Sequence, residues 1–390
     1  MAARVILIVL DGCGVGAMPD AASYGVDDPQ SATLPHVALA VGGIALPTLE
    51  SLGLGRIADI QGVNPCDPAR GAFGKLVERS AGKDSVTGHW EMMGIITRVP
   101  FPIYLDGFPD DVVAEFTRLI GRGVLGNRPA SGTQIIEQLG EEHVRTGKPI
   151  VYTSADSVFQ VAAHEDIISV PDLYGICETA RGMLVAPHNV ARVIARPFAG
   201  ESATTFRRTG NRRDFPLAPP KPNVLSALAN AGASVHAVGV VADLFPHNYF
   251  TSFERTQSNR QHLAAIERAM AQGGFDLLFA NCEDFDMLYG HRNDPVGFAE
   301  ALVEFDKALS GIIAAMGPDD LLLLTADHGN DPTTASTDHS REFAPLIALG
   351  AGVHPGQDLG TRDTFADIGA MIADRLGAPW AGPGRVLIAS

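Results

Sequence analysis

The stretch VILIVLDGCG, residues 5–14, indicates the fold class. In it, an apolar run typical of a strand is followed by the start of a glycine-rich turn. Residues 5–10 are continuously apolar, which is typical of a strand buried on both faces of a parallel sheet. The turn DGCGVGAMPD (11–20) follows directly. Later apolar runs have the same form, and we expect each to be a core strand: 233–241, 275–281, 320–327 and 343–350.

Helical patterns lie between these runs. Residues 262–270 carry apolar side chains at helical spacing, and in 295–316 the residues Phe298, Leu302, Phe305 and Leu309 recur every three or four positions. Strands that alternate with helices indicate an α/β fold with a mostly parallel central sheet flanked by helices.

The middle of the chain differs from both ends. We expect helices at 110–120 and 133–146, strands at 151–154 and 191–195, and a stiff hinge at the prolines of 216–222. We therefore predict a smaller α+β domain at 100–218, inserted into a core made of 1–99 and 219–390. One continuous large domain is the alternative.

Composition excludes several classes of protein. The chain has 390 residues, of which 46% are hydrophobic, so general disorder is excluded. A net charge of −16 argues against nucleic-acid and anionic-membrane partners. Four dispersed cysteines form no disulfide framework or zinc-finger spacing, and no apolar run is long enough for a signal peptide or a membrane span. We expect a reduced, cytoplasmic protein.

Residues that commonly bind metals gather where the expected strands end. Asp11 follows the first strand, Asp286 and His291 follow the strand at 275–281, and the segment TADHGNDPTTASTDHSRE (325–342) supplies Asp327, His328 and His339. Carboxylate and imidazole ligands without thiolates suit Mn²⁺, Zn²⁺ or Mg²⁺. Six such residues fit two metals rather than one. Each alone could be a helix cap or an ordinary loop residue.

A nucleophile is expected in GKDSVTGHWEMMG (82–94), which offers the hydroxyls of Ser85 and Thr87 and the imidazole of His89. A hydroxyl beside a metal is deprotonated more easily and so becomes a nucleophile. The alternative role is that of an N-cap for a helix starting near His89. Spacing alone does not choose between Ser85 and Thr87.

Arginines cluster near the end of the predicted inserted domain: Arg192, Arg196, Arg207, Arg208, Arg212 and Arg213. Guanidinium groups match the geometry of phosphate, so a phosphate site is one interpretation of this cluster. Salt bridges between the domains are the other.

These motifs resemble those of the phosphopentomutases, a family of the alkaline phosphatase superfamily. The resemblance extends over nearly the whole chain and rests on GVGAMPDA, GKDSVTGHWE, ASGTQIIEQLGEEH, TGKPIVYTSADSVFQVAAHE, ARVIARPF, DFDMLYGHR, TADHGNDP, TDHSRE and TFADIGA. The stretch at 147–165 is the most specific, whereas TADHGN alone would indicate only the superfamily.

The resemblance implies an alkaline-phosphatase-like core with a cap at 100–218. It implies that Thr87 carries the phosphoryl group and bridges two Mn²⁺ ions, although other divalent ions remain open. One ion would be bound by Asp11, Asp327 and His328, and the other by Asp286, His291 and His339. A sugar bisphosphate would be needed to phosphorylate Thr87. The implied reaction interconverts (deoxy)ribose 1-phosphate and 5-phosphate.

The resemblance also implies that sugar phosphates are the small-molecule partners. Ser154 and Asp156 would contact the sugar, and Arg192 and Arg208 would contact phosphate. The sequence names no protein partner.

The chain departs from the family pattern at three positions: Gly12 replaces a serine, Val240 a lysine, and Glu283 an apolar residue. A phosphatase or another sugar-phosphate mutase on the same metals is the alternative activity. A metal-binding protein without catalysis is a third class.

Overall fold

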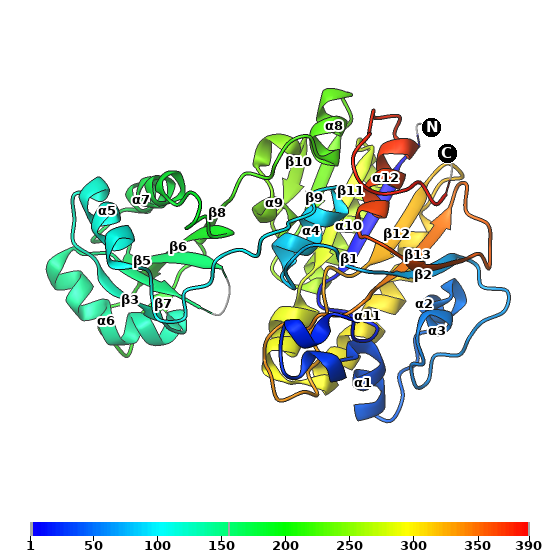
Figure 1. Cartoon of the computed structure of the whole chain (residues 1–390), viewed down its shortest axis with the longest axis horizontal. Coiled ribbons are helices and arrows are strands. Elements are labelled where there is room, and N and C mark those ends of the chain that lie inside the picture. The colour runs from blue at the N-terminus through cyan, green and yellow to red at the C-terminus, as the bar shows by residue number, and fades with distance from the viewer. Residues whose placement is uncertain (1–2, 155–156, 389–390) are drawn as a thin grey trace. The chain divides into compact units, whose positions relative to one another are not determined.

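The computed structural model describes residues 3–154 and 157–388 and forms two compact units (Figure 1). The first unit comprises Met1–Pro100 and Pro219–Ser390, and the inserted unit comprises Phe101–Ala218. Among the described residues, no helix is both long and apolar enough to cross a membrane.

The first unit contains an eight-stranded sheet within the described residues. Its strands, in spatial order, are β10 (Ser252–Glu254), β9 (Val235–Val238), β11 (Leu277–Cys282), β1 (Val5–Leu10), β12 (Leu321–Thr325), β13 (Ala344–Gly350), β2 (Ala72–Leu76) and β14 (Asp358–Arg362). β1 runs parallel to both β11 and β12, with Leu10 opposite Cys282 and Val9 opposite Thr325. Every residue of β1, β11 and β12 is buried, as their apolar sequences predict.

The predicted α/β class with a mostly parallel sheet is confirmed, with one antiparallel strand. β13 runs antiparallel to β12 and to β2. The other strand pairs of this sheet are parallel.

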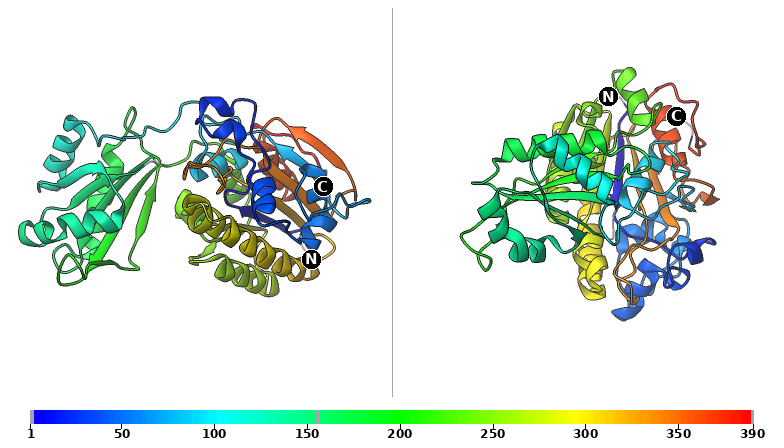
Figure 2. Two further views of the ribbon diagram at one scale, coloured as in Figure 1. Left: turned by 90° about the horizontal axis from the view of Figure 1, so that it is seen from below. Right: turned by 60° about the vertical axis from the view of Figure 1, so that its left-hand side comes forward.

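Helices cover the sheet of the first unit (Figure 2). α10 packs on β11 and on α11, and α11 also contacts α1 and α2, whereas α12 packs against α4 and α8. Their bounds are α1 (Thr33–Ala40), α2 (Pro47–Leu52), α3 (Leu54–Ile57), α4 (Ser85–Met92), α8 (Val224–Asn230), α9 (Val241–Leu244), α10 (Asn259–Gln272), α11 (Pro295–Ala314) and α12 (Ala366–Arg375). Short helical turns are η1 (Ala21–Ser23), η2 (Asp28–Gln30), η3 (His247–Tyr249), η4 (Phe285–Tyr289) and η5 (Gly290–Arg292).

The inserted unit is a second sheet with a helical layer on each face (Figure 1). Its strands are β3 (Leu125–Pro129), β4 (Ile150–Thr153), β5 (Val158–His164), β6 (Arg192–Ala199), β7 (Arg207–Arg208) and β8 (Arg213–Pro216). α5 (Asp110–Ile120) and α7 (Val170–Met183) bury Phe116 and Leu173 in one core. α6 (Gly132–Thr146) buries Ile135 and Ile136 in another.

Candidate active site

Three neighbouring strands bring the predicted ligands to one edge of the first sheet. Asp11 follows β1, Asp327 and His328 lie just beyond β12, and Asp286 lies in η4 after β11. Because β1 lies between β11 and β12 and is parallel to both, all three carboxyl ends meet at the same edge. η4 is a π-helix, a conformation often found at functional sites.

The ligand-type residues form two groups, and within each group the ligand atoms lie within 4.8 Å of one another. One group is Asp286, His291 and His339, and the other is Asp11, Asp286 and His328. Asp286 Oδ2 is 3.1 Å from His291 Nε2, and its Oδ1 is 3.5 Å from His339 Nε2. Asp11 Oδ1 is 3.3 Å from His328 Nε2. Asp286 therefore belongs to both groups.

Asp327 lies next to the group of Asp11, Asp286 and His328. Its Oδ2 atom is 3.4 Å from His328 Nε2. Asp327 Oδ2 also lies 3.3 Å from Nδ1 of the buried His89, which donates to the Ser85 carbonyl oxygen at 2.8 Å. Of the predicted trio, Asp11 and Asp327 both lie beside His328 Nε2, but the group of ligand atoms that includes Asp11 and His328 has Asp286 as its third member.

The donor set fits divalent cations. Asp11 Oδ1 and Asp327 Oδ2 are buried and, among the described residues, have no hydrogen-bond partner. Two imidazoles have Nδ1 bound to a backbone carbonyl oxygen, His291 to Thr337 at 2.6 Å and His328 to Gly329 at 3.1 Å. Their Nε2 atoms lie on the side of the carboxylates, 3.1 Å from Asp286 for His291 and 3.3 Å from Asp11 for His328, which is the orientation of known histidine metal ligands.

The charges are strongly coupled. Burial raises the pKa of Asp11, and so does the charge of Asp327. Burial also acts to raise the pKa of Asp286, but His339 and His291 hold it well below its usual range. Burial acts to lower the pKa of His328, but Asp327 and Asp11 bring it well above its usual value. Positive charge beside these carboxylates is therefore favourable, and divalent cations would supply it.

Two asparagines hold the carboxylates in place, and the sequence analysis missed both. Asn281 Nδ2 donates to Asp11 Oδ2 at 2.6 Å, and Asn330 Nδ2 donates to Asp286 Oδ1 at 2.6 Å. Asn281 is the one amide in the apolar strand β11, and Asn330 closes the motif TADHGN. A polar residue inside a buried strand was the signal available for Asn281.

The nucleophile loop leads into α4, and its two hydroxyls differ in position. The helix starts at Ser85 with Asp84 as its N-cap, so the alternative role, a Ser or Thr N-cap for a helix starting near His89, is wrong. Ser85 Oγ lies 3.2 Å from His328 Nε2. Thr87 is fully buried, and its Oγ1 accepts from the Asp84 N–H at 3.3 Å as part of a capping box. The same hydroxyl donates to the Asp84 carbonyl oxygen at 2.9 Å.

The predicted substrate residues lie in the inserted unit. Ser154 follows β4, whereas Asp156 lies outside the described residues. Arg192 on β6 is 3.4 Å from Asp214, a salt bridge within the unit. Arg208 on β7 is exposed.

Two of the three departures from the family pattern touch each other. The backbone N–H of Val240, at the start of α9, donates to Glu283 Oε2 at 3.2 Å. Glu283 Oε1 also lies 3.7 Å from Nε2 of the buried His262. The position without the lysine therefore has a carboxylate beside it.

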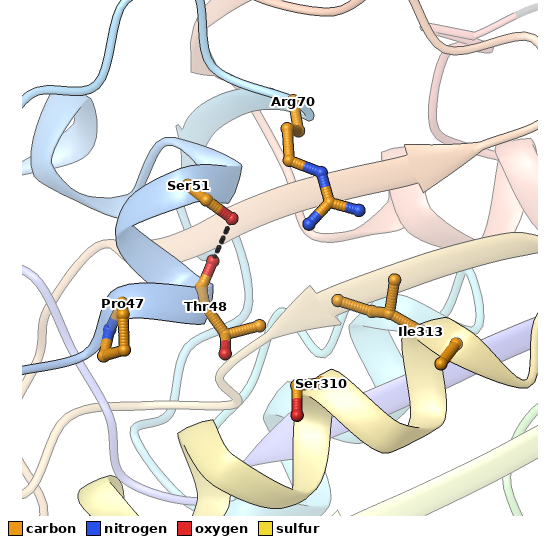
Figure 3. A pocket seen from close by; sticks show the side chains of 7 residues that line it. Pro47, Thr48, Ser51, Arg70, Ser310 and Ile313 are labelled. Carbon is orange, nitrogen blue, oxygen red and sulfur yellow. Dashed lines mark hydrogen bonds between the residues drawn. The ribbon is translucent and has the colours of Figure 1, made fainter.

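A separate cavity of about 520 Å³ in the first unit lies between α2, the loop at Arg70 and α11 (Figure 3). It is lined by Pro47, Thr48, Ser51, Arg70, Ser310, Ile313 and Ala314. None of these is a carboxylate or an imidazole, so the cavity is distinct from the metal-ligand cluster.

The fold and the ligand cluster define a metal-dependent enzyme. A family model, the Metalloenzyme superfamily, matches residues 3–379. Among solved structures, the chain is similar to the PH0037 protein from Pyrococcus horikoshii, with a TM-score of 0.51 at 15% identity over 98% of this chain and 100% of that one. It is also similar to Leishmania mexicana phosphoglycerate mutase, with a TM-score of 0.50 at 15% identity over 100% and 98% of the two chains. The predicted fold class is confirmed.

The sequence relatives are more specific. The chain is 52% identical to the phosphopentomutase of Symbiobacterium thermophilum over 98% of this chain and 97% of that relative. It is 51% identical to the phosphopentomutase of Carboxydothermus hydrogenoformans over 96% of each. The chain belongs to the phosphopentomutase family and is an isomerase of the phosphoryl-transferring type.

Proposed function

We propose that this chain interconverts the 1-phosphate and the 5-phosphate of ribose or deoxyribose by passing the phosphoryl group through a hydroxyl at the start of α4. The names of its relatives support the substrate class. The observation that carries the mechanism is the 3.2 Å distance from Ser85 Oγ to His328 Nε2, which puts an alcohol beside the ligand cluster.

Ser85 is the first choice for the phosphoryl carrier, in place of the Thr87 that the family resemblance implies. Ser85 is partly exposed and stands at the first position of α4, where the helix dipole favours a phosphate group. Thr87 Oγ1 instead lies within its own capping box, 3.0 Å from Asp84 Oδ2. Moving that hydroxyl to a phosphate would break the cap.

Two divalent ions fit the cluster, one with Asp11, Asp327 and His328 and the other with Asp286, His291 and His339. Bound ions would neutralise the phosphoryl oxygens and make the carrier hydroxyl easier to ionise. We propose Mn²⁺ for both, with a sugar bisphosphate needed to load the carrier at first. Asn281 and Asn330 would hold the carboxylates of Asp11 and Asp286 in orientation.

The chain's own residues would then act in two matched steps. In the first, the free sugar hydroxyl attacks the phosphorus on the loaded carrier, the bond from that phosphorus to the carrier oxygen breaks, and a sugar bisphosphate results. In the second, the carrier oxygen attacks the other phosphorus of the bisphosphate and the bond to its sugar oxygen breaks, so the isomerised monophosphate leaves and the loaded carrier returns. Because the carrier is regenerated, no water enters the balance. The inserted unit would bind the sugar phosphate through Ser154, Asp156, Arg192 and Arg208.

The test is incubation with Mn²⁺, a sugar bisphosphate and ribose 5-phosphate, with ribose 1-phosphate and free phosphate measured separately. We expect ribose 1-phosphate and little free phosphate. Phosphopeptide mapping should place one phosphate in residues 82–94, at Ser85. Stoichiometric release of free phosphate would make the enzyme a phosphatase and overturn the proposal.

A further inference from the structure

Glu342, the last residue of the motif TDHSRE, is a buried carboxylate outside both groups of ligand atoms. Its side chain is surrounded by donors from the chain itself. Oε2 accepts from the backbone N–H groups of Gly16 at 3.0 Å and Thr33 at 2.9 Å. Oε1 accepts from the hydroxyls of Thr33 and Ser340, each at 2.7 Å. Four donors occupy the acceptor positions of a carboxylate, so its orientation is fixed.

Two of these donors lie in segments that carry metal-ligand candidates. Gly16 belongs to the loop that follows β1 and begins with Asp11. Ser340 comes directly after His339 in the chain. The two ligand candidates are far apart in the sequence, and they belong to different groups of ligand atoms. The carboxylate of Glu342 therefore joins the segment of one group to the segment of the other.

The segment that follows β12 is tied to the same carboxylate by two routes. Gly329 and Ser340 exchange two backbone hydrogen bonds, of 3.0 and 2.7 Å. The Thr33 hydroxyl, which donates to the carboxylate, also accepts from the backbone N–H of Asn330 at 3.1 Å. The side chain of Asn330 then donates to Asp286 Oδ1 at 2.6 Å. A short chain of hydrogen bonds thus connects the carboxylate with the ligand candidate that both groups share.

Two glycines make room for the carboxylate. A Cβ on Gly14 would overlap Glu342 Oε2, and a Cβ on Gly329 would overlap Glu342 Oε1. Gly14 lies in the loop after β1, and Gly329 lies in the segment after β12. Both backbones approach the carboxylate this closely only because these two residues have no side chain.

We propose that Glu342 is a positioning residue that holds the loops after β1 and β12 and the segment at His339 in the arrangement that binds metal. It would act through Gly16, Thr33 and Ser340 and would not itself be a ligand. Groups that orient metal ligands from outside typically change metal affinity by about 10- to 100-fold when they are lost. The inference rests on the proposed binding of divalent ions by the cluster.

Glu342→Gln is the sharpest variant, because it keeps the shape of the side chain and turns one acceptor into a donor. Backbone N–H groups cannot become acceptors, so the new amide group should face the two hydroxyls rather than Gly16 and Thr33 N–H. The hydroxyls of Thr33 and Ser340 would then lose the oxygen to which they donate. The segments on that side should be held less firmly.

The first test is a Mn²⁺ titration of the full chain after removal of metal by dialysis, with free Mn²⁺ measured by electron paramagnetic resonance. Glu342→Gln should raise the dissociation constant by about 10-fold or more. Thr33→Val keeps its backbone N–H and loses only the hydroxyl, so it should raise the constant by a smaller factor. This second variant decides the question if Glu342→Gln does not fold.

Asp306→Asn is the matched control. Asp306, like Glu342, is a carboxylate that is 1% exposed, and it accepts from the N–H groups of Thr48 at 3.0 Å and Leu49 at 2.7 Å at the start of α2. The control should lower the free energy of unfolding and leave Mn²⁺ affinity unchanged. An equal loss of affinity in Asp306→Asn, or wild-type affinity in both Glu342→Gln and Thr33→Val, would overturn the inference.

Hydrogen exchange of the metal-free chain measures the holding of the loops without metal. Glu342→Gln should speed exchange in peptides that cover residues 12–18 and 328–342, and Asp306→Asn should not. Faster exchange with unchanged Mn²⁺ affinity would show a carboxylate that only stabilises the fold, and would also overturn the inference. If the wild-type chain binds no Mn²⁺, the proposed metal cluster fails and the inference fails with it. If the wild type binds Mn²⁺ and Glu342→Gln binds it equally well, only the inference fails.

Discussion

Two helices of this protein begin in opposite ways. α4 in the first unit starts with a complete capping box, in which Asp84 accepts from the N–H groups of Val86 and Thr87. α6 in the inserted unit starts with Ser131, whose side chain makes no cap hydrogen bond. A helix start that the chain satisfies itself can hold a neighbouring hydroxyl in position. The N–H groups at an exposed start without a side-chain cap are left to solvent.

The start of α4 is also held from outside the helix. Glu91 accepts from the Ser80 N–H at 2.6 Å, and the buried Arg341 donates to the carbonyl oxygens of Ser80 at 2.8 Å and Gly82 at 2.5 Å. These bonds fix the loop that leads into Ser85. A group that receives and releases a phosphoryl group benefits from this rigidity, because misplacement of the reacting atoms is costly.

The largest expected effect separates the two hydroxyls of α4. Ser85→Ala should lower turnover of ribose 5-phosphate by at least about 1,000-fold, because it removes the atom that bonds to phosphorus. Thr87→Ala should cost about 1 kcal/mol in the free energy of unfolding through the lost cap and retain most of the turnover. Steady-state kinetics and intact-mass analysis measure both variants.

The reverse pattern would restore the assignment implied by the family resemblance. If Thr87→Ala folds normally but loses both the phosphate and the activity while Ser85→Ala retains them, Thr87 is the carrier. The comparison of the helix starts would then be broken, because a hydroxyl inside a capping box would be reactive.

The next largest effect is expected from replacing the metal-ligand candidate that belongs to both groups of ligand atoms. Asp286 lies in both ligand groups, and His291 lies in only one. Asp286→Asn should therefore lower the bound divalent ions from about two per chain to fewer than one, whereas His291→Ala should leave about one. Metal analysis after dialysis measures this, and equal losses in the two variants would contradict the shared position of Asp286.

The sequence predicted the regular parts of the fold for a physical reason. Continuous apolar runs can be buried only on both faces of a sheet, so β1, β11 and β12 were predictable. β2 and β14 were not predicted, because AFGKL and DLGTR are short, contain glycine and carry polar residues. Such strands form through their neighbours rather than through their own pattern.

The candidate site also has a part that the sequence predicted and a part that it did not. Ligand-type residues after parallel strands meet at one edge, and the structure brings Asp11, Asp286 and His328 together there, whereas the predicted trio had Asp327 in the place of Asp286. Which hydroxyl faces them depends on the rotation of α4, and that is set by the cap at Asp84.

A smaller effect is expected from removing the cap of α4. Asp84→Ala should lower the free energy of unfolding by about 1–2 kcal/mol and also lower kcat, because Ser85 loses its fixed position. Denaturant unfolding and kinetics measure the two changes. Asp166→Ala, at a side chain that is 90% exposed, is the matched control and should change neither. A stable Asp84→Ala variant with normal kcat would show that Glu91 and Arg341 are sufficient to position the loop.

The smallest expected effect comes from giving α6 the cap that it lacks. Ser131 has φ −65° and ψ 133°, an extended conformation compatible with an N-cap residue. Ser131→Asp should raise the free energy of unfolding of the inserted unit by about 0.5–1 kcal/mol, because a carboxylate would accept from the first N–H groups and face Arg208. Ser131→Ala is the control and should change the free energy of unfolding little, since the native hydroxyl makes no cap bond. A loss of 1 kcal/mol or more in Ser131→Ala would mean that Ser131 does cap α6, and the contrast with α4 would disappear.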